Sequence, residues 1–253
     1  LTKVAVTLDA CGLQCPGPIR RVFEEMQNLN DGDIIEVRAT DPGFAKDITS
    51  WSKNTGNTML KSEFDKSKKA FVAYVQKGKV GTEAQSTIAE AAMQIENKNG
   101  STMVVFSGDL DKAIASFIIA TGAASMGKEV TMFFTFWGLN VLKKKDRPKV
   151  KKNVVEKMFD FMLPSNPGKL PLSKMNMGGM GARMMRYIMN KKNIDSLESL
   201  RTQAILNGVE FIACQMSMDV MGVKREELLD HVTIGGVATY MNRAEQANVN
   251  LFI

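Results

Sequence analysis

The spacing of apolar residues changes near residue 100 and divides this 253-residue chain into two parts. In residues 1–78, apolar and polar side chains alternate in short runs such as 4–8, which is typical of strands with one buried face. In residues 100–253, runs such as 102–106 are nearly continuously apolar, which is typical of strands buried on both faces. Segments with helical spacing separate the runs in both parts, so the pattern predicts an α/β protein with two domains.

The first part, residues 1–78, predicts the order β-α-β-α-β-β. Its first helical segment carries Phe23 on an apolar stripe that we expect to be buried. We expect Asp41 and Pro42 to begin the second helix, as a capping carboxylate followed by a proline at the first helical position. Two helices on one face of a four-stranded sheet would form a two-layer sandwich. The stretches concerned are 4–8, 19–29, 35–39, 44–51, 58–64 and 69–76.

The second part, residues 100–253, follows a polar stretch, 79–99, that we interpret as a linker with a possible short helix. Strands and helices alternate in this part, which predicts an open parallel sheet with helices on both faces. Its longest uncharged runs are shorter than the ~20 residues of a membrane span, so we expect no transmembrane segment. The predicted strands are 102–106, 130–136, 209–213, 232–234 and 249–253, and the predicted helices are 111–126, 195–207, 225–230 and 236–246.

The chain has three cysteines and one histidine, His231. So few cysteines argue against a disulfide scaffold, and we expect free thiols in a reducing compartment, the cytoplasm. A single histidine leaves too few ligands for the usual zinc sites and disfavours a histidine-dependent catalytic triad, so we expect no metal. The net charge of +6 does not by itself indicate nucleic acid, and we expect no DNA partner. No Gly-x-Gly-x-x-Gly nucleotide fingerprint occurs, so we expect no cofactor in this chain.

Cys15 stands directly before Pro16, and Pro18 follows two residues later. Proline is favoured in the first turn of a helix, so Cys15 is expected at or just before a helix N-terminus. Free N–H groups and the positive end of the helix dipole favour a thiolate there and lower the pKa of a cysteine. This arrangement would activate the thiol without a histidine.

The stretches "LDACGLQCPGPI" (8–19) and "DPGFAKDITSW" (41–51) resemble the TusA family of small sulfur carriers. The resemblance covers residues 1–78 and implies that Cys15 carries sulfur as a persulfide. Two positions depart from the family pattern: Gly56-Asn57 replaces a frequent Gly-His pair, and Cys11 stands where an aliphatic residue is usual. The matching residues are Leu8, Asp9, Gly12, Leu13, Cys15, Pro16, Pro18, Asp41, Pro42, Asp47, Ile48 and Trp51.

Cys11 lies four residues before Cys15, in the loop between the first strand and the first helix. It is interpreted either as a partly buried small residue or as a thiol that resolves a persulfide on Cys15 or forms a disulfide with it. The spacing is not the two-residue redox motif, so both interpretations stay open.

Cys214 directly follows a predicted strand, which places it at the carboxyl edge of the parallel sheet. Open α/β sheets build their sites at this edge. Ser107-Gly108-Asp109, Phe136-Trp137-Gly138 and Gly235-Gly236 also follow strands, so we expect them to gather there. A cysteine in this position is as often structural as functional.

Four stretches of the second part resemble the DsrE/DsrF-like sulfur-transfer family, in a branch that is often fused behind TusA domains. They are 104–142, 172–181, 213–222 and 235–253. The resemblance implies a flavodoxin-like domain in which Cys214 bears sulfur, and a tendency to form homo-oligomers. The same pair of domains often follows a rhodanese domain in flavin-dependent coenzyme A-disulfide reductases. Because the chain begins with Leu1, we expect it to be a piece of such a protein, whose FAD and coenzyme A would belong to a missing segment.

Between the second predicted strand of this part, 130–136, and residue 195 lies an insertion-like stretch of unusual composition, and 143–192 is its charged portion. The run 143–152, "KKKDRPKVKK", is interpreted either as a solvated basic stretch or as a dock for an acidic partner. Eight of the eighteen methionines fall in 158–189, interleaved with glycines. Because methionine adapts to varied surfaces, this segment would be a mobile lid, a partner surface or ordinary core.

The sequence therefore predicts a sulfurtransferase-type carrier that relays sulfane sulfur as persulfides on Cys15 and Cys214. Its expected partners are other sulfur-transfer proteins, such as a rhodanese or a cysteine desulfurase. One alternative is a thiol-disulfide oxidoreductase that uses Cys11 and Cys15. A second is a pair of accessory domains of a flavin coenzyme A-disulfide reductase. A basic module that binds RNA or a membrane surface through residues 1–78 is a further alternative, although no aromatic stacking strand is visible there.

Overall fold

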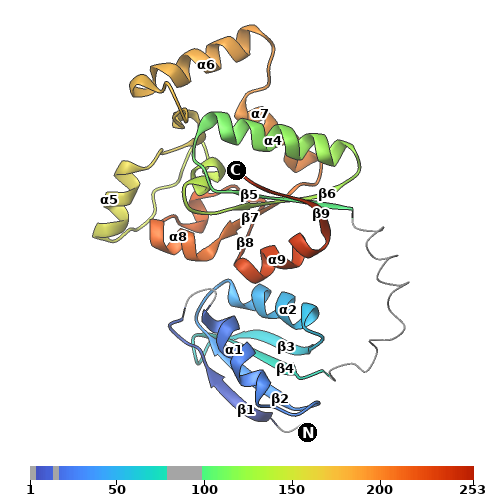
Figure 1. The fold of residues 1–253 in the computed structure, drawn as a ribbon. Coiled ribbons are helices and arrows are strands. Elements are labelled where there is room, and N and C mark those ends of the chain that lie inside the picture. Colours follow the sequence, from blue (N-terminus) through green and yellow to red (C-terminus); the bar gives the residue numbers. More distant parts are fainter. Residues whose placement is uncertain (1–3, 14–16, 79–98) are drawn as a thin grey trace. The chain divides into compact units, whose positions relative to one another are not determined.

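The computed structural model describes residues 4–13, 17–78 and 99–253, which form two compact units (Figure 1). The described residues up to 78 belong to the first unit, together with Ile234–Gln246. The second unit holds Asn99–Thr233 and Ala247–Ile253. All but one residue of the expected linker, 79–99, lie outside the described residues.

The first unit has the predicted order β-α-β-α-β-β. Its four strands form a mixed sheet in the order β1-β2-β4-β3, in which β1 and β2 are parallel and the other two pairs antiparallel. The parallel pair brings the carboxyl ends of β1 and β2 to one edge of the sheet. The elements are β1 Val4–Asp9, α1 Gly17–Gln27, β2 Ile34–Ala39, α2 Phe44–Asn54, β3 Thr58–Asp65 and β4 Ala70–Gln76.

The core of the first unit joins both helices to one face of the sheet. Val22 of α1 and Phe44 and Ile48 of α2 are buried against Ile35 and Val37 of β2, which alternate along that strand as a buried face requires. The expectation that Phe23 belongs to the buried stripe of α1 is wrong, because its side chain is exposed. An apolar stripe on a short helix is wider than the surface that its sheet covers, and Phe23 lies on the margin of that stripe.

The second helix begins later than predicted. Helix α2 starts at Phe44, its N-cap residue is Gly43, and no side chain caps it. Asp41 instead accepts the N–H of Gly43 at 3.2 Å, in a turn that precedes the helix. An aspartate followed by proline and glycine favours such a turn as readily as a cap, so the interpretation of Asp41 as the capping residue is wrong.

The second unit contains the predicted parallel sheet, with strands in the order β8-β7-β6-β5-β9. The pairs β5–β6, β5–β9 and β6–β7 are all parallel. Numbered from β5, this order is 4-3-2-1-5, which differs from the 2-1-3-4-5 order of flavodoxin. From β5 the chain adds β6, β7 and β8 in turn on one side. It then returns to the other side of β5, where β9 forms the opposite edge of the sheet. The strands are β5 Gly100–Val105, β6 Glu129–Phe134, β7 Glu210–Cys214, β8 Val232–Gly235 and β9 Ala247–Phe252.

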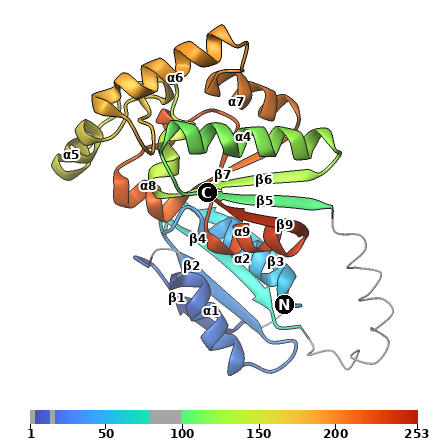
Figure 2. The ribbon, with the colours of Figure 1, turned by 45° about the horizontal axis from the view of Figure 1, so that its top comes forward.

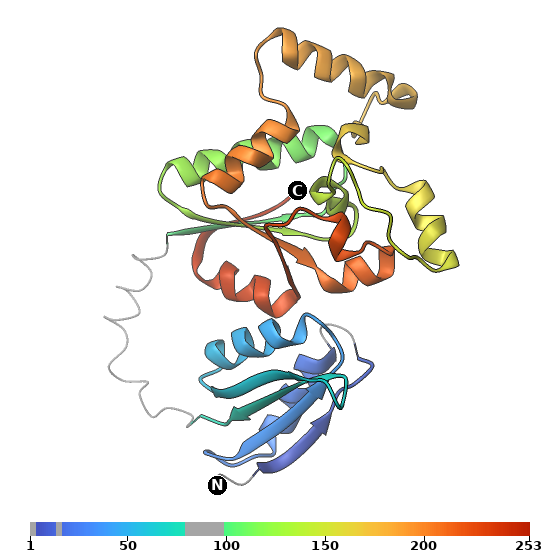
Figure 3. The ribbon, with the colours of Figure 1, turned by 180° about the vertical axis from the view of Figure 1, so that it is seen from behind.

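Two helices lie side by side on one face of this sheet, α4 Leu110–Ser125 and α7 Leu197–Leu206 (Figures 1 and 3). Ala113, Phe117 and Ala120 form the buried side of α4. The remaining α-helices of the second unit are α5 Val154–Met162, α6 Met180–Lys191 and α8 Gln215–Met221, whereas α9 Val237–Glu245 falls in the first unit. Among the described residues, no helix is long and apolar enough to cross a membrane.

The helix predicted at 225–230 is reduced to a 3₁₀ turn, Arg225–Glu227. The Arg225 guanidinium donates to the carbonyl oxygens of Leu229 and Asp230 at 2.9 and 2.8 Å, and these bonds hold the following chain in a loop. Helix α8, directly after β7, was not expected from the sequence. It has seven residues, too few for an apolar periodicity to stand out.

The insertion, residues 143–192, holds α5 and α6, which lie at the periphery of the second unit (Figure 2). Its basic run is only partly solvated: Lys143 is fully buried and Arg147 and Lys152 pair with the buried Glu227. The interpretation of the methionine-rich segment as ordinary core is wrong, because seven of its eight methionines are exposed and Met189 alone is buried.

Candidate functional site

The loop after β1 holds the first candidate thiol, Cys11. The Cys11 N–H donates to Oδ1 of Asp9 at 2.9 Å, and the Gly12 N–H donates to the hydroxyl of Thr40 at 2.9 Å. Gly12 has a φ of 79°, which a residue with a side chain adopts only with strain. These bonds fix the backbone of the loop at the carboxyl edge of β1 and β2, while the Cys11 side chain stays exposed.

The surroundings of Cys11 oppose the ionisation of its thiol. Partial burial raises the pKa of the Cys11 thiol, and the carboxylate of Asp9 raises that pKa further by accepting its proton in a hydrogen bond. The same contacts with Cys11 lower the pKa of Asp9, so the aspartate is a stable anion. Because the thiolate is the nucleophile, Cys11 is held in the less reactive form.

Cys15 and Pro16, which the sequence assigns to the same loop, lie outside the described residues. Pro18 is buried on α1, a helix that begins at Gly17, two residues after Cys15 in the sequence. The prediction that Cys15 stands at a helix N-terminus stays a prediction.

Asp41 and Asp47, the two aspartates of the 41–51 stretch, are both buried and hydrogen-bonded within the protein. Asp41 is buried in the turn before α2. Asp47 is also buried, and its Oδ1 accepts the hydroxyl of Thr239 at 2.6 Å and the N–H of Gly236 at 3.0 Å, within the first compact unit. Gly235 ends β8, a strand of the five-stranded sheet, and Gly236 is the N-cap residue of α9. The expectation that Gly235-Gly236 gathers with the other turns at the sheet edge stays a prediction.

Cys214, the second candidate thiol, ends β7 and occupies the N-cap position of α8. Its side chain is free, in the sense that it forms no disulfide, and is only 5% exposed. The hydroxyls of Thr135, at the end of β6, and Ser217 of α8 share a hydrogen bond of 2.7 Å beside it in the fold. The prediction that Cys214 lies at the carboxyl edge of a parallel sheet is confirmed, and the thiol is covered there.

A cavity of about 360 Å³ opens at the same edge, above β5 and β6. Ser107, Gly108 and Asp109 line it, together with Trp137 and Asn140 of the 3₁₀ helix η1, Phe136–Leu142. The expected meeting of the 107–109 and 136–138 turns at one edge is therefore confirmed. Cys214 is not among the lining residues, so the turns and the thiol do not share this cavity.

Hydrogen bonds and an ion pair link polar groups that line or border this cavity. The Ser107 hydroxyl donates to Oδ2 of Asp109 at 2.8 Å, and the Lys112 ammonium lies 3.0 Å from the same oxygen. The buried amide of Asn140 donates to the carbonyl of Trp137 at 3.0 Å, while its Oδ1 has no partner among the described residues. Lys112 and Asn140 were not expected from the sequence. Lys112 reaches Asp109 from the first turn of α4, and Asn140 gains its place when η1 packs against the end of β5.

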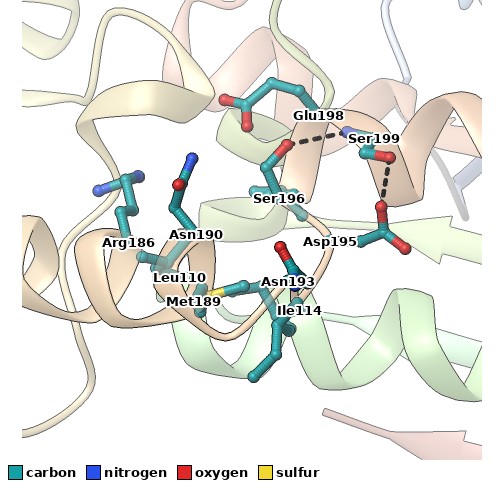
Figure 4. A pocket seen from close by; sticks show the side chains of 12 residues that line it. Leu110, Ile114, Arg186, Met189, Asn190, Asn193, Asp195, Ser196, Glu198 and Ser199 are labelled. Carbon is teal, nitrogen blue, oxygen red and sulfur yellow. Dashed lines mark hydrogen bonds between the residues drawn. The ribbon is translucent and has the colours of Figure 1, made fainter.

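A larger cavity, about 520 Å³, lies between α4, α6 and the start of α7 (Figure 4). Arg186, Asn190 and Glu198 contribute polar groups, and Leu110 and Ile114 contribute apolar ones. No cysteine lines it. Among the described residues, no group of three or more histidine, cysteine, aspartate or glutamate side chains is arranged to hold a metal ion.

Comparison with known proteins matches the two parts of the chain to two families. Residues 97–252 match the DsrE/DsrF/DrsH-like family, and residues 6–77 match the sulfurtransferase TusA family. The uncharacterized protein YrkE of Bacillus subtilis is 48% identical over 158 residues, which cover 62% of this chain and 99% of YrkE.

Two relatives from Allochromatium vinosum match one part each. The sulfur carrier protein DsrE2 is 35% identical over 160 residues, which cover 60% of this chain and 96% of that protein. The sulfur carrier protein TusA is 43% identical over 56 residues, which cover 22% of this chain and 74% of that protein.

Proposed function

Because the chain belongs to the DsrE/DsrF/DrsH-like family and carries a TusA domain ahead of that region, we propose that it is a sulfur carrier with two sulfur-bearing cysteines. Relatives of both parts bear the name sulfur carrier protein. Cys15 and Cys214 each hold a sulfane sulfur as a persulfide. The observation that carries this assignment is the presence of a cysteine in each family region at the position where a site is expected: directly before Pro16 in the sequence, and at the carboxyl end of β7.

The transfer step is a thiol exchange that needs no external oxidant. The thiolate of the accepting cysteine attacks the outer sulfur of a donor persulfide, a new S–S bond forms, and the donor leaves as a thiolate. One proton is lost from the accepting thiol and one is returned to the donor. Asp9, Asp41, Asp47 and Pro18 support this chemistry by shaping the first unit, and Pro16 supports it through its place next to Cys15 in the sequence. Ser107, Gly108 and Asp109 support it by shaping the sheet edge of the second unit.

The burial of Cys214 suits the storage of a persulfide. A persulfide is reactive toward oxidants and other thiols, so a covered sulfur survives longer than an exposed one. Exchange at Cys214 then requires a local opening around α8 and η1.

The alternative oxidoreductase, with Cys11 and Cys15 as its pair, is not favoured. Its support is the proximity of the two cysteines in the sequence and the exposure of Cys11. Against it stands the raised pKa of Cys11, which makes this residue a poor attacking thiol.

Several wider features belong to the same proposal. The domains are 1–78, TusA-like, and 100–253, DsrE-like, joined by 79–99, in keeping with the matched regions. The partners are sulfur-transfer proteins such as a rhodanese or a cysteine desulfurase, and the chain acts as a homo-oligomer in the cytoplasm. The two matches cover the TusA-like and DsrE-like regions, and a place within a coenzyme A-disulfide reductase stays a prediction.

The test is persulfide loading from a small donor such as glutathione persulfide. We expect the full chain to gain ~32 Da at Cys15 and at Cys214, since persulfidation adds one sulfur atom to a reactive thiol. Cys15→Ser and Cys214→Ser should each remove one increment, whereas Cys11→Ser should remove none. A chain that gains no sulfur at either position, under conditions that load an established carrier, would refute the proposal.

A further inference from the structure

The apolar side of helix α5 faces outward, whereas an ordinary surface helix turns its apolar side toward the core. Phe161 is 92% exposed, Val154 83% and Met162 73%, and Met158 is exposed on the same side. No residue of α5 is buried. An exposed face of this kind costs free energy in water, and in a folded protein it marks an interaction surface.

Ion pairs hold the polar side of α5 against the protein. Glu156 accepts from Lys224 at 2.7 Å, and Asp160 accepts from Lys152 at 2.9 Å and from Arg147. Arg147 and Lys152 also pair with the fully buried Glu227. Because both acidic residues of the helix are turned inward and fixed, rotation of α5 to bury its apolar side would break these pairs.

The surroundings of the exposed side are strongly basic. Residues 143–192 hold 14 lysines and arginines and three acidic residues, a larger surplus than the +6 of the whole chain. Of those acids, Glu156 and Asp160 are turned inward, which leaves Asp146 as the one carboxylate of the insertion outside these pairs. The exposed basic residues next to α5 are Lys145, Lys149, Lys151 and Lys157, and none is in a salt bridge with the described part of the chain.

We propose that α5 is an interfacial helix that docks this chain on an anionic membrane surface. Its apolar side enters the boundary between headgroups and acyl chains, while the neighbouring lysines bind lipid phosphates. The combination of Phe, Met and Val on one side with lysine at the margins is the pattern of helices that lie in that boundary. Lys149 and Lys151 are exposed in the segment before α5, and the long stem of a lysine lets its ammonium group stay in the headgroup layer.

The residue types favour a lipid surface over a protein groove. Protein interfaces are enriched in arginine and depleted in lysine, whereas the exposed cations beside α5 are lysines and Arg147 is turned inward. The apolar side of α5 is also a ridge of separate, highly exposed side chains, and a fluid bilayer adapts to such a ridge without a matching concave surface. The binding partner of α5 is therefore a layer of acidic phospholipid headgroups.

The test is co-sedimentation of the full chain with vesicles of phosphatidylcholine alone or with phosphatidylglycerol added. We expect binding to the anionic vesicles at low salt, about tenfold or more above binding to neutral vesicles, and a marked loss at high salt. Phe161→Ser should weaken the binding about tenfold, because it removes the most exposed apolar side chain of α5. Leu206→Ser, at an 80% exposed apolar position on α7, is the matched control and should bind like the unmodified chain.

Three results would overturn the proposal. The first is no binding to anionic vesicles at low salt. The second is equal binding by Phe161→Ser and Leu206→Ser. The third is a lipid-free dimer, seen by light scattering, that Phe161→Ser separates into monomers, because a second copy would then cover α5. Circular dichroism of both variants should match that of the unmodified chain, since both side chains are exposed.

Discussion

The loop after β1 and the end of β7 each carry a free cysteine at the carboxyl edge of parallel strands, in opposite surroundings. Cys11 is exposed, and its neighbours on a surface loop keep its proton in place. Cys214 is 5% exposed and is the N-cap residue of α8, a helix whose Ser217 bonds to Thr135 at the end of β6. We therefore expect the two thiols to be limited in different ways: Cys11 by its raised pKa, and Cys214 by its burial.

The largest expected effect is a difference in alkylation rate between the two thiols, measured at alkaline pH. Labelling of Cys214 by iodoacetamide in the native chain should be about a hundredfold slower than labelling of Cys11, because the buried thiol reacts only after a local opening. Peptide mass spectrometry over time measures both rates in one sample. Equal rates would remove the distinction on which the comparison rests.

The next effect concerns Lys143, a buried amine that follows η1. Burial lowers its pKa to about 8, so above that pH the folded chain binds fewer protons at this site than the unfolded chain, whose lysines titrate near 10.4. The free energy of unfolding should therefore rise by about 2 kcal/mol between pH 7.5 and 9.5, relative to the Lys143→Met variant.

Urea unfolding at the two pH values measures this difference. Lys145→Met, at an exposed lysine two residues away, is the matched control and should keep the pH dependence of the unmodified chain. A Lys143→Met variant with the same pH dependence would show that Lys143 does not titrate as a buried amine.

A smaller effect tests what covers Cys214. Thr135→Val removes the hydroxyl that pairs with Ser217 and leaves the buried Ser217 hydroxyl without its partner. We expect a loss of about 1–2 kcal/mol in the free energy of unfolding and a faster labelling of Cys214. Thr49→Val, on the exposed side of α2, should alter neither quantity. Unchanged labelling of Cys214 in Thr135→Val would place its protection elsewhere.

The smallest effect sharpens the account of Cys11. Asp9→Asn removes the charge that helps to raise the pKa of the Cys11 thiol, so that pKa should fall. At neutral pH, the labelling of Cys11 should then become about threefold faster. The pH profile of labelling measures the pKa directly, and an unchanged profile would mean that Asp9 has no part in holding the proton.

Elements with a regular apolar period could be predicted from the sequence, and elements held by single contacts could not. The alternation at 35–39 and the apolar run at 130–134 predicted β2 and β6. Burial of one or both faces of a strand determines the polarity of each successive residue, so the pattern is visible in the sequence. Cys214 could be placed at a strand end for the same reason. Its burial could not be predicted, because the helix that follows it, α8, is too short to show an apolar period.

The insertion shows the limit most clearly. The apolar face of α5 obeys helical spacing, and that spacing normally indicates a buried side. Its orientation is set instead by ion pairs with Lys152 and Lys224, one of them 68 residues away in the chain. In the basic run, Lys143 is buried and Lys145 is exposed, a difference that depends on contacts such as the bond from Lys143 to the carbonyl of Pro164 at 3.0 Å.

Peptide-resolved mass spectrometry of the full chain after exposure to glutathione persulfide tests the central claim most directly. We expect the peptide with Cys15 and the peptide with Cys214 each to gain ~32 Da that a reductant removes, with the buried Cys214 loading more slowly. Sulfur on Cys11 in place of these two residues, or no sulfur on any cysteine, would contradict the claim that each family region carries one sulfur-bearing cysteine.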